Sequence, residues 1–160
     1  QVVLEIGSLT IGSYTYKLYD YQRLDSNTGK PRPIHLEMGR RVIHPERTAD
    51  YVAENLVNHG YTVREGDGWR EFVVGEHDLL YFSLRNESIE KTIDDDTQDD
   101  FHVLALVDGD KARVESIDHP ELAYEMDYMD IVVVPATLGR YRIVNLSKGP
   151  IVIHKTLLKK

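Results

Sequence analysis

The sequence predicts a mainly β protein, an antiparallel β-barrel or sandwich with a short helical segment before it. Short apolar segments follow one another closely from residue 61 to the C-terminus, and Gly and Pro stand between them. Two earlier segments have apolar residues at helical spacing instead. The change of pattern near residues 60–68 predicts a boundary between an N-terminal part, 1–60, and an all-β part, 61–160.

Strands are expected at the start of the N-terminal part. Residues 2–6, VVLEI, are apolar and largely β-branched. Residues 14–21, YTYKLYDY, alternate so that Lys17 and Tyr19 share one face of a predicted strand. The next segment, 25–33, is dense in turn formers and predicts a loop.

Helices are predicted after this loop. The first covers residues 33–43, where Pro33 suits the first turn and the apolar residues fall on one face. The second lies within residues 46–60, and Gly60 is a residue typical of a helix C-terminus.

The all-β part is divided by turn residues into short strands. They are expected in 69–79, 79–93, 101–117 (two strands joined around 108–110), 122–145 and 150–158. The acidic run 93–100, IDDDTQDD, is interpreted as a solvated loop. It lacks the glycine and the distant glutamate of a calcium-binding loop.

Composition excludes several classes of protein. A net charge of -8 without a basic run argues against binding duplex nucleic acid. The absence of cysteine excludes disulfides and thiolate metal sites; it leaves the redox compartment open, with a cytoplasmic setting as the default expectation. The apolar runs are too short for a membrane span, and residues 1–10 do not resemble a signal peptide.

Residues 127–145, DYMDIVVVPATLGRYRIVN, resemble the second conserved motif of the cupin superfamily, G-D-x(4)-P-x-G-x-x-H-x(3)-N. Asp130, Pro135, Gly139 and Asn145 fit its outline. The resemblance implies a cupin-like antiparallel β-barrel, also called a jelly roll.

Two departures concern the metal site of that superfamily. Met129 stands where the turn glycine usually lies, and no histidine follows Gly139. Near the expected upstream motif only His102 is present, without a second histidine close by. The seven histidines are scattered along the chain, at His35, His44, His59, His77, His102, His119 and His154. We therefore expect a cupin barrel to which no residue of this chain contributes a metal ligand.

The order of segments also resembles type I phosphomannose isomerases. In that family an LEI strand is followed by a strand of the form Y-(R/K)-x-Y-D-x-x-R, a loop, a short helix and a C-terminal cupin lobe. Here the sequences LEI and YKLYDYQR stand at 4–6 and 16–23, and the match covers nearly the whole chain. The resemblance implies linked cupin barrels and zinc-dependent interconversion of mannose 6-phosphate and fructose 6-phosphate.

The zinc ligands of that family would all lie upstream of Gln1. The chain also begins without methionine, so we expect it to be the C-terminal portion of a longer protein. Residues 1–60 would be the tail of the catalytic barrel plus a helical connection, and 61–160 a C-terminal barrel without metal ligands. On this interpretation the fragment alone is inactive.

The resemblance also suggests site residues. Lys17 stands where the family has a catalytic arginine, and a cation there would stabilise the negative charge that builds up on an enediol. Tyr19 and Arg23 are candidates for contacting a sugar phosphate. A strand lysine that extends to solvent is the competing interpretation of Lys17. For Lys30 and Arg32 in the following loop, a solvated position is preferred.

Two further roles stay open for the β part. It could bind a sugar or sugar phosphate without chemistry, which a pocket lined by Tyr and Arg would favour. It could instead be a purely structural lobe. The expected partners are a sugar phosphate substrate, no nucleic acid and no membrane, and a homo-oligomer formed by strand exchange is possible where strand edges are exposed.

Overall fold

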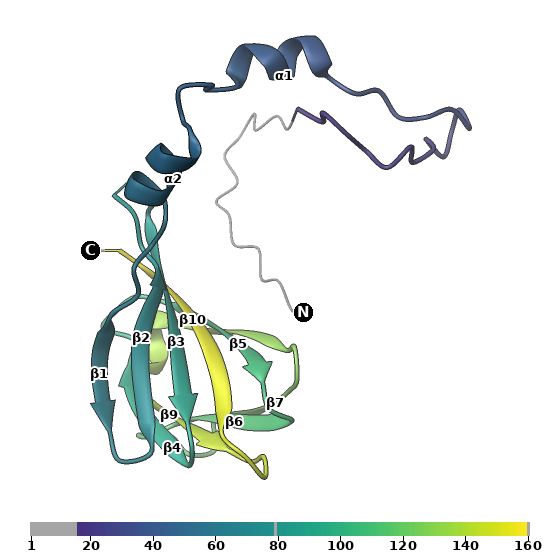
Figure 1. Cartoon of the computed structure of the whole chain (residues 1–160). Helices are drawn as coiled ribbons and strands as arrows, with labels where there is room; N and C mark the ends of the chain where they lie inside the picture. Colours follow the sequence, from purple (N-terminus) through teal and green to yellow (C-terminus); the bar gives the residue numbers. More distant parts are fainter. Residues whose placement is uncertain (1–15, 79, 160) are drawn as a thin grey trace. The chain divides into compact units, whose positions relative to one another are not determined.

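A computed structural model describes residues 16–78 and 80–159 of the chain, which divides into two units, 1–55 and 56–160 (Figure 1). Each unit is described by itself. Among residues 16–55 the structure has two α-helices, α1 (Leu36–Val42) and α2 (Ala49–Asn55). Both fall within the predicted helical segments. Helix α2 buries none of its residues, so no packing supports further turns toward Gly60. No helix in the described part of the chain is long and apolar enough to cross a membrane.

The strand predicted for residues 14–21 is not found over its described part, 16–21. A strand needs a neighbouring strand to satisfy its backbone groups, but the backbone of Lys17 is bonded to His35 instead. The Lys17 N–H donates to His35 Nδ1 at 3.1 Å, and the His35 N–H donates to the Lys17 carbonyl at 2.7 Å. The strand predicted at 2–6 lies outside the described residues.

The second unit is built of antiparallel strands, as predicted. The described residues of this unit form ten strands: β1 (Thr62–Gly66), β2 (Trp69–Gly75), β3 (Phe82–Ile89), β4 (Thr92–Asp96), β5 (His102–Asp108), β6 (Lys111–Ser116), β7 (Ala123–Asp127), β8 (Ile131–Val134), β9 (Arg140–Asn145) and β10 (Ile151–Leu158). They form a six-stranded sheet in the order β1-β2-β3-β10-β5-β8 and a four-stranded sheet in the order β4-β9-β6-β7. Strand β10, yellow in Figure 1, runs between β3 and β5.

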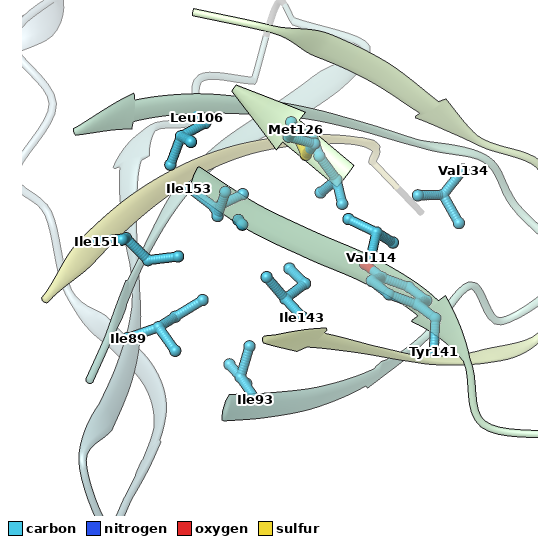
Figure 2. Close-up of a cluster of buried hydrophobic side chains, with 12 residues drawn as sticks. Ile89, Ile93, Leu106, Val114, Met126, Val134, Tyr141, Ile143, Ile151 and Ile153 are labelled. Carbon is cyan, nitrogen blue, oxygen red and sulfur yellow. The ribbon is translucent and has the colours of Figure 1, made fainter. Parts of the chain in front are cut away.

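The core lies between the two sheets. Figure 2 shows the side chains of Ile89, Ile151 and Ile153 from the six-stranded sheet facing Ile93 and Ile143 from the four-stranded sheet. All five are at most 1 % exposed. The inward positions recur every second residue, which is the period of a strand. This apolar packing joins the sheets into one barrel.

The acidic run 93–100, predicted as a solvated loop, is a loop only in its second half, 97–100. Its first residues belong to β4, which pairs with β9 through Ile93↔Ile143 and Asp95↔Tyr141. Because Ile93 is buried in the core, Asp95 two residues later points to the same inner side of the sheet. The alternation of side chains along the strand, and not the acidic composition, decides which residues of this run point inward.

The turn before β8 explains one departure from the cupin motif. Met129 has φ of 72°, the left-handed conformation that glycine adopts more readily than other residues. Its N–H donates to the Leu106 carbonyl at 2.9 Å, and the Asp130 N–H closes the turn on the Asp127 carbonyl at 2.9 Å. Methionine therefore occupies the turn conformation that the motif assigns to glycine.

Asn145, the last residue of that motif, bonds several backbone segments together. Its side-chain amide donates to the carbonyls of Glu90 and Gly149 at 2.9 and 2.8 Å, and its oxygen accepts from the Ser147 N–H at 2.7 Å. The motif residue is thus a structural residue that holds the β3–β4 and β9–β10 turns in register.

We expect Asn145→Ala to lower the free energy of unfolding by about 1–3 kcal/mol, because it leaves several backbone groups without their partner. Urea denaturation followed by Trp69 fluorescence measures this change. Asn58→Ala is the matched control, since Asn58 accepts one exposed hydrogen bond, from the Glu76 N–H. Equal losses in the two variants would contradict the structural role of Asn145.

Candidate functional site

The inner faces of several strands change from apolar to charged toward one end of the barrel. Along β10, Ile151 and Ile153 are followed at the next inward position by Lys155. The same change occurs on β3, which runs antiparallel to β10, so that the buried Glu87 comes two residues before the buried Ile89. Six side chains meet at this end and are called here the charged cluster: Arg64, Glu71, Arg85, Glu87, Asp95 and Lys155.

Lys155 is the centre of the charged cluster. Its side chain is only 2 % exposed, and its ammonium lies 2.7 Å from Glu71 Oε1, 2.7 Å from Glu87 Oε1 and 2.5 Å from Asp95 Oδ2. Glu71 and Glu87 are also fully buried and lie directly opposite each other on β2 and β3. Two carboxylates in such a position repel each other unless a cation lies between them. The Lys155 ammonium supplies that cation.

Two arginines complete the charge balance of the cluster. Arg64 donates to Glu71 through Nε, and its Nη2 lies 3.0 Å from Asp95 Oδ1. Arg85 donates from Nη1 to Glu71 Oε1 at 2.9 Å. The cluster therefore holds three cations and three carboxylates, and burial of so many charges is tolerated because they are paired.

The two opposed glutamates have opposite pKa shifts. Burial disfavours the charged form of Glu71, but Lys155, Arg64 and Arg85 outweigh it and lower the pKa of Glu71 to about 2. For Glu87 burial dominates, the neighbouring carboxylates add to it, and the pKa is raised to about 7 despite Lys155. Among the described residues Glu87 Oε2 is buried without a hydrogen-bond partner, and Oε1 lies 2.7 Å from the Lys155 ammonium. Glu87 is thus the carboxylate of this cluster that takes up a proton first.

A chain of hydrogen bonds connects the charged cluster to His102. The Tyr141 hydroxyl donates to Asp95 Oδ2 at 3.0 Å and lies 2.7 Å from His102 Nδ1. A hydroxyl has one hydrogen, so His102 Nδ1 carries the proton of its own bond and Nε2 keeps a lone pair. Burial, followed by the charge of Lys155, lowers the pKa of His102, which favours this neutral form.

A cavity of about 480 Å³ opens beside the charged cluster. Its lining includes Arg64, Lys155 and His102, together with apolar side chains. A smaller cavity of about 280 Å³ shares Arg85 and His102 with it. Charged groups with perturbed pKa values beside a concave surface are typical of binding and catalytic sites, so we take this end of the barrel as the candidate site.

The residues of the candidate site do not fit a catalytic metal. Such a site needs three protein ligands that converge on an open position. Here Glu71, Glu87 and Asp95 converge on the ammonium of Lys155. The histidine at this end, His102, bonds to Tyr141 through one ring nitrogen. In the described part of the chain no group of three His, Cys, Asp or Glu side chains has the geometry to hold a metal ion.

The residues that sequence reasoning selected, Lys17, Tyr19 and Arg23, lie in the first unit, whereas the cavity lies in the second. Lys17 is half-buried and Tyr19 is exposed, with its ring 4.8 Å from the ring of Tyr21 in an edge-to-face contact. Their roles stay predictions.

The guanidinium of Arg23 is bound to a carboxylate within the first unit. It donates to Asp20 Oδ1 at 2.7 Å, and Arg32 donates to Asp20 Oδ2 at 2.6 Å. Asp20 is buried, and its hydrogen bonds with Arg32 and then Arg23 hold its pKa well below the usual range. Arg32, which was expected to be solvated, instead helps to hold the loop together.

The charged cluster was not predicted from the sequence. A signal was present, because charged residues occupy inward positions of otherwise apolar strands, as Lys155 does in IVIHKTLL. Only pairing across the sheets shows that these positions belong to one end of the barrel. No sequence-local motif brings Arg64, Asp95 and Lys155 together.

Solved structures with TM-scores of at least 0.50 support this architecture. The chain is similar to the mannose 6-phosphate isomerase from Bacillus subtilis, with a TM-score of 0.64 and 21 % identity over 88 % of this chain and 39 % of that chain. It is also similar to vicilin from Corylus avellana (hazelnut), with a TM-score of 0.50 and 19 % identity over 62 % of this chain and 31 % of that one. The Schizosaccharomyces pombe Cnp3 cupin domain matches with a TM-score of 0.48 and 13 % identity over 61 % of this chain and 69 % of that one.

The fold is that of a cupin. At these identities the likeness extends to the fold alone. The chain spans about two fifths of the length of the mannose 6-phosphate isomerase that it matches. No protein-family model matches the sequence, and the search of curated proteins gives no match.

Proposed function

We propose that this chain is the C-terminal portion of a type I mannose-6-phosphate isomerase, and that its cupin barrel is a metal-free lobe without chemistry of its own. The observation that carries the proposal is the extent of the likeness to the Bacillus subtilis isomerase. It covers 88 % of the chain, more than the second unit, 56–160, contains. It therefore supports a correspondence that includes part of the first unit as well as the barrel.

The charged cluster supports the non-catalytic role of this barrel. Its three carboxylates neutralise an ammonium and two guanidinium groups, so they are not available as ligands for an incoming metal ion. In the proposed parent protein, zinc would be held by residues upstream of Gln1, where it would supply a Lewis acid for the isomerisation. The residues that this chain contributes to that reaction would be Lys17, Tyr19 and Arg23.

Lys17 has the chemistry for a specific part of the proposed reaction. Interconversion of an aldose and a ketose through an enediol places negative charge on the sugar oxygens, and a nearby ammonium stabilises that charge. In the parent protein Arg23 would hold the phosphate of the substrate, which requires its guanidinium to be shared with Asp20 or released from it.

The coding sequence upstream of Gln1 tests the proposal directly. We expect it to encode a Gln-x-His pair, then a glutamate, and a second histidine shortly before the LEI segment. A stop codon immediately upstream would contradict the proposal. Turnover of mannose 6-phosphate by the 160-residue chain with added zinc would contradict the non-catalytic role of the barrel.

In the longer protein we expect Lys17→Met to lower kcat by roughly 10²–10³-fold, the usual effect of removing one group that stabilises an oxyanion. A coupled assay of fructose 6-phosphate formation measures this change. Lys30→Met is the control, because Lys30 is an exposed lysine of the following loop. If kcat of Lys17→Met stays within twofold of the parent value, Lys17 has no catalytic role and is a solvent-facing lysine.

A second candidate function is ligand binding by the barrel itself. A barrel filled throughout by aliphatic side chains would count against it, and the apolar half of this barrel is filled in that way. The other half is not, because the cavity of about 480 Å³ is lined by Arg64, Arg85 and Arg140. This cavity favours a polar ligand, and the two functions are compatible in one protein.

A further inference from the structure

We propose that the cavity at the charged end of the barrel binds an uncharged polyhydroxyl compound, such as a free monosaccharide or a sugar alcohol, in preference to a sugar phosphate. The inference rests on the binding role proposed above for the barrel and narrows it to one chemical class. It concerns the second unit alone.

Charge balance within the cavity is the first reason. The lining contains four cations and four carboxylates: Arg64, Arg85, Arg140 and Lys155, and Glu71, Asp94, Asp95 and Asp96. A phosphate dianion would add two negative charges to a site that is already neutral, and part of the site is shielded from water. An uncharged ligand has no such cost.

The second reason is that the arginines are already paired. The pairs are Arg64 with Glu71, Arg85 with Glu71, and Arg140 with Asp118. Phosphate recognition uses arginine as a bidentate donor. A phosphate would therefore have to displace a carboxylate from one of these pairs, whereas a hydroxyl can accept from a remaining N–H without breaking the pair.

The third reason is that the site offers both kinds of hydrogen-bonding group. Within the described residues, Arg85 Nε and Ser83 Oγ are buried without a hydrogen-bond partner, and both residues line the smaller cavity. His102, which lines both cavities, has a lone pair on Nε2 when its Nδ1 donates to Tyr141. A hydroxyl group donates and accepts at once, so several hydroxyls on one ligand match this mixture.

The fourth reason is that part of the cavity wall is apolar. Val63, Ile117 and Leu157 line the larger cavity between the charged groups. Sugar rings and sugar alcohols have carbon–hydrogen surfaces that pack on aliphatic side chains, while their hydroxyls are bonded at the edges. Inorganic phosphate has no surface of this kind.

The experiment titrates the full 160-residue chain, labelled with ¹⁵N, with four probes: D-mannose, D-sorbitol, mannose 6-phosphate and inorganic phosphate. Chemical shifts give the affinity and the location of each. We expect D-mannose or D-sorbitol, or both, to bind about tenfold more tightly than mannose 6-phosphate, a difference of about 1.4 kcal/mol. The shifted signals are expected to include His102 and Gln98, which line both cavities.

Two matched pairs of variants test the location. Val63 and Val133 are exposed valines on the two edge strands of the six-stranded sheet, and of the two only Val63 is in the lining of this cavity. Val63→Trp is expected to weaken binding about tenfold by filling the space, and Val133→Trp to leave it within about twofold.

The second pair uses two arginines of β9. Arg140 is exposed and Arg142 half-exposed, and each is 2.5 Å from a carboxylate, but Arg142 does not line the cavity. Arg140→Gln is expected to weaken binding of the uncharged probe, and Arg142→Gln to leave it within about twofold.

Three results would overturn the inference. Tighter binding of mannose 6-phosphate or phosphate would keep the binding role but remove the preference for an uncharged ligand. Equal effects of Val63→Trp and Val133→Trp would place the ligand elsewhere. If none of the four probes binds, the inference and the binding role both fail, while the proposed isomerase origin, which the upstream coding sequence tests, is unaffected.

Discussion

Lys155→Met is expected to lower the free energy of unfolding by about 3–5 kcal/mol, because it removes the cation shared by three carboxylates. The side chain that replaces it has a similar length, so the effect reports charge rather than lost volume. Glu71 and Glu87 would then face each other across β2 and β3 without the ammonium between them. Urea denaturation at pH 7 followed by circular dichroism and Trp69 fluorescence measures the loss.

Two further variants make the Lys155 prediction specific. Lys111→Met removes a half-exposed lysine that pairs with Glu125 and Asp127 and is expected to cost less than about 1 kcal/mol. The double variant Lys155→Met/Glu87→Gln restores equal numbers of cations and carboxylates in the charged cluster. It is expected to recover at least about half of the loss. A double variant no more stable than Lys155→Met would show that charge balance is not the cause.

Glu87→Gln is expected to change how stability depends on pH. The pKa of Glu87 is raised from 4.5 to about 7 in the folded protein, chiefly by burial. Between these values the unfolded chain loses a proton that the folded chain keeps, so the stability of the parent protein falls as pH rises. The free energy of unfolding of Glu87→Gln, relative to that of the parent, is therefore expected to rise by about 2–3 kcal/mol between pH 5 and pH 8.

Glu71→Gln is the control for this pH dependence. The pKa of Glu71 is lowered to about 2, so its contribution to stability is present above the unfolded value of 4.5 and is lost as pH falls toward 2. Glu71→Gln is therefore expected to lower the free energy of unfolding by nearly the same amount at pH 5 and at pH 8. Parallel pH profiles for the parent and Glu87→Gln would mean that Glu87 is ionised in the folded protein at pH 5.

Much of the second unit could be predicted from the sequence because strands leave a period of two. The segments 69–75, 102–108 and 151–158 were all predicted as strands and are strands in the structure. The antiparallel barrel follows from their number and close spacing. Two features of this unit were not predicted: strand β1, Thr62–Gly66, and the extension of strand β4 into the acidic run, where the acidic composition of 93–100 concealed the inward position of Asp95.

The first unit could be predicted less well. Its helices α1 and α2 were placed correctly by the spacing of their apolar residues. The predicted strand at 16–21 failed because alternation is only half of what a strand needs; the backbone also needs a neighbouring strand, and Lys17 bonds to His35 instead.

The candidate site depended on tertiary structure most of all. The sequence offers only His102 near the expected metal-ligand motif and no local pattern that marks the charged cluster. The sequence by itself determined the strands and which positions of each strand point inward. Only the tertiary structure decided that Glu71, Asp95 and Lys155, from three strands far apart in the chain, meet at one end of the barrel. The physical reason is that the period of a strand is local, whereas pairing of buried charges depends on the register between strands and on the packing of two sheets.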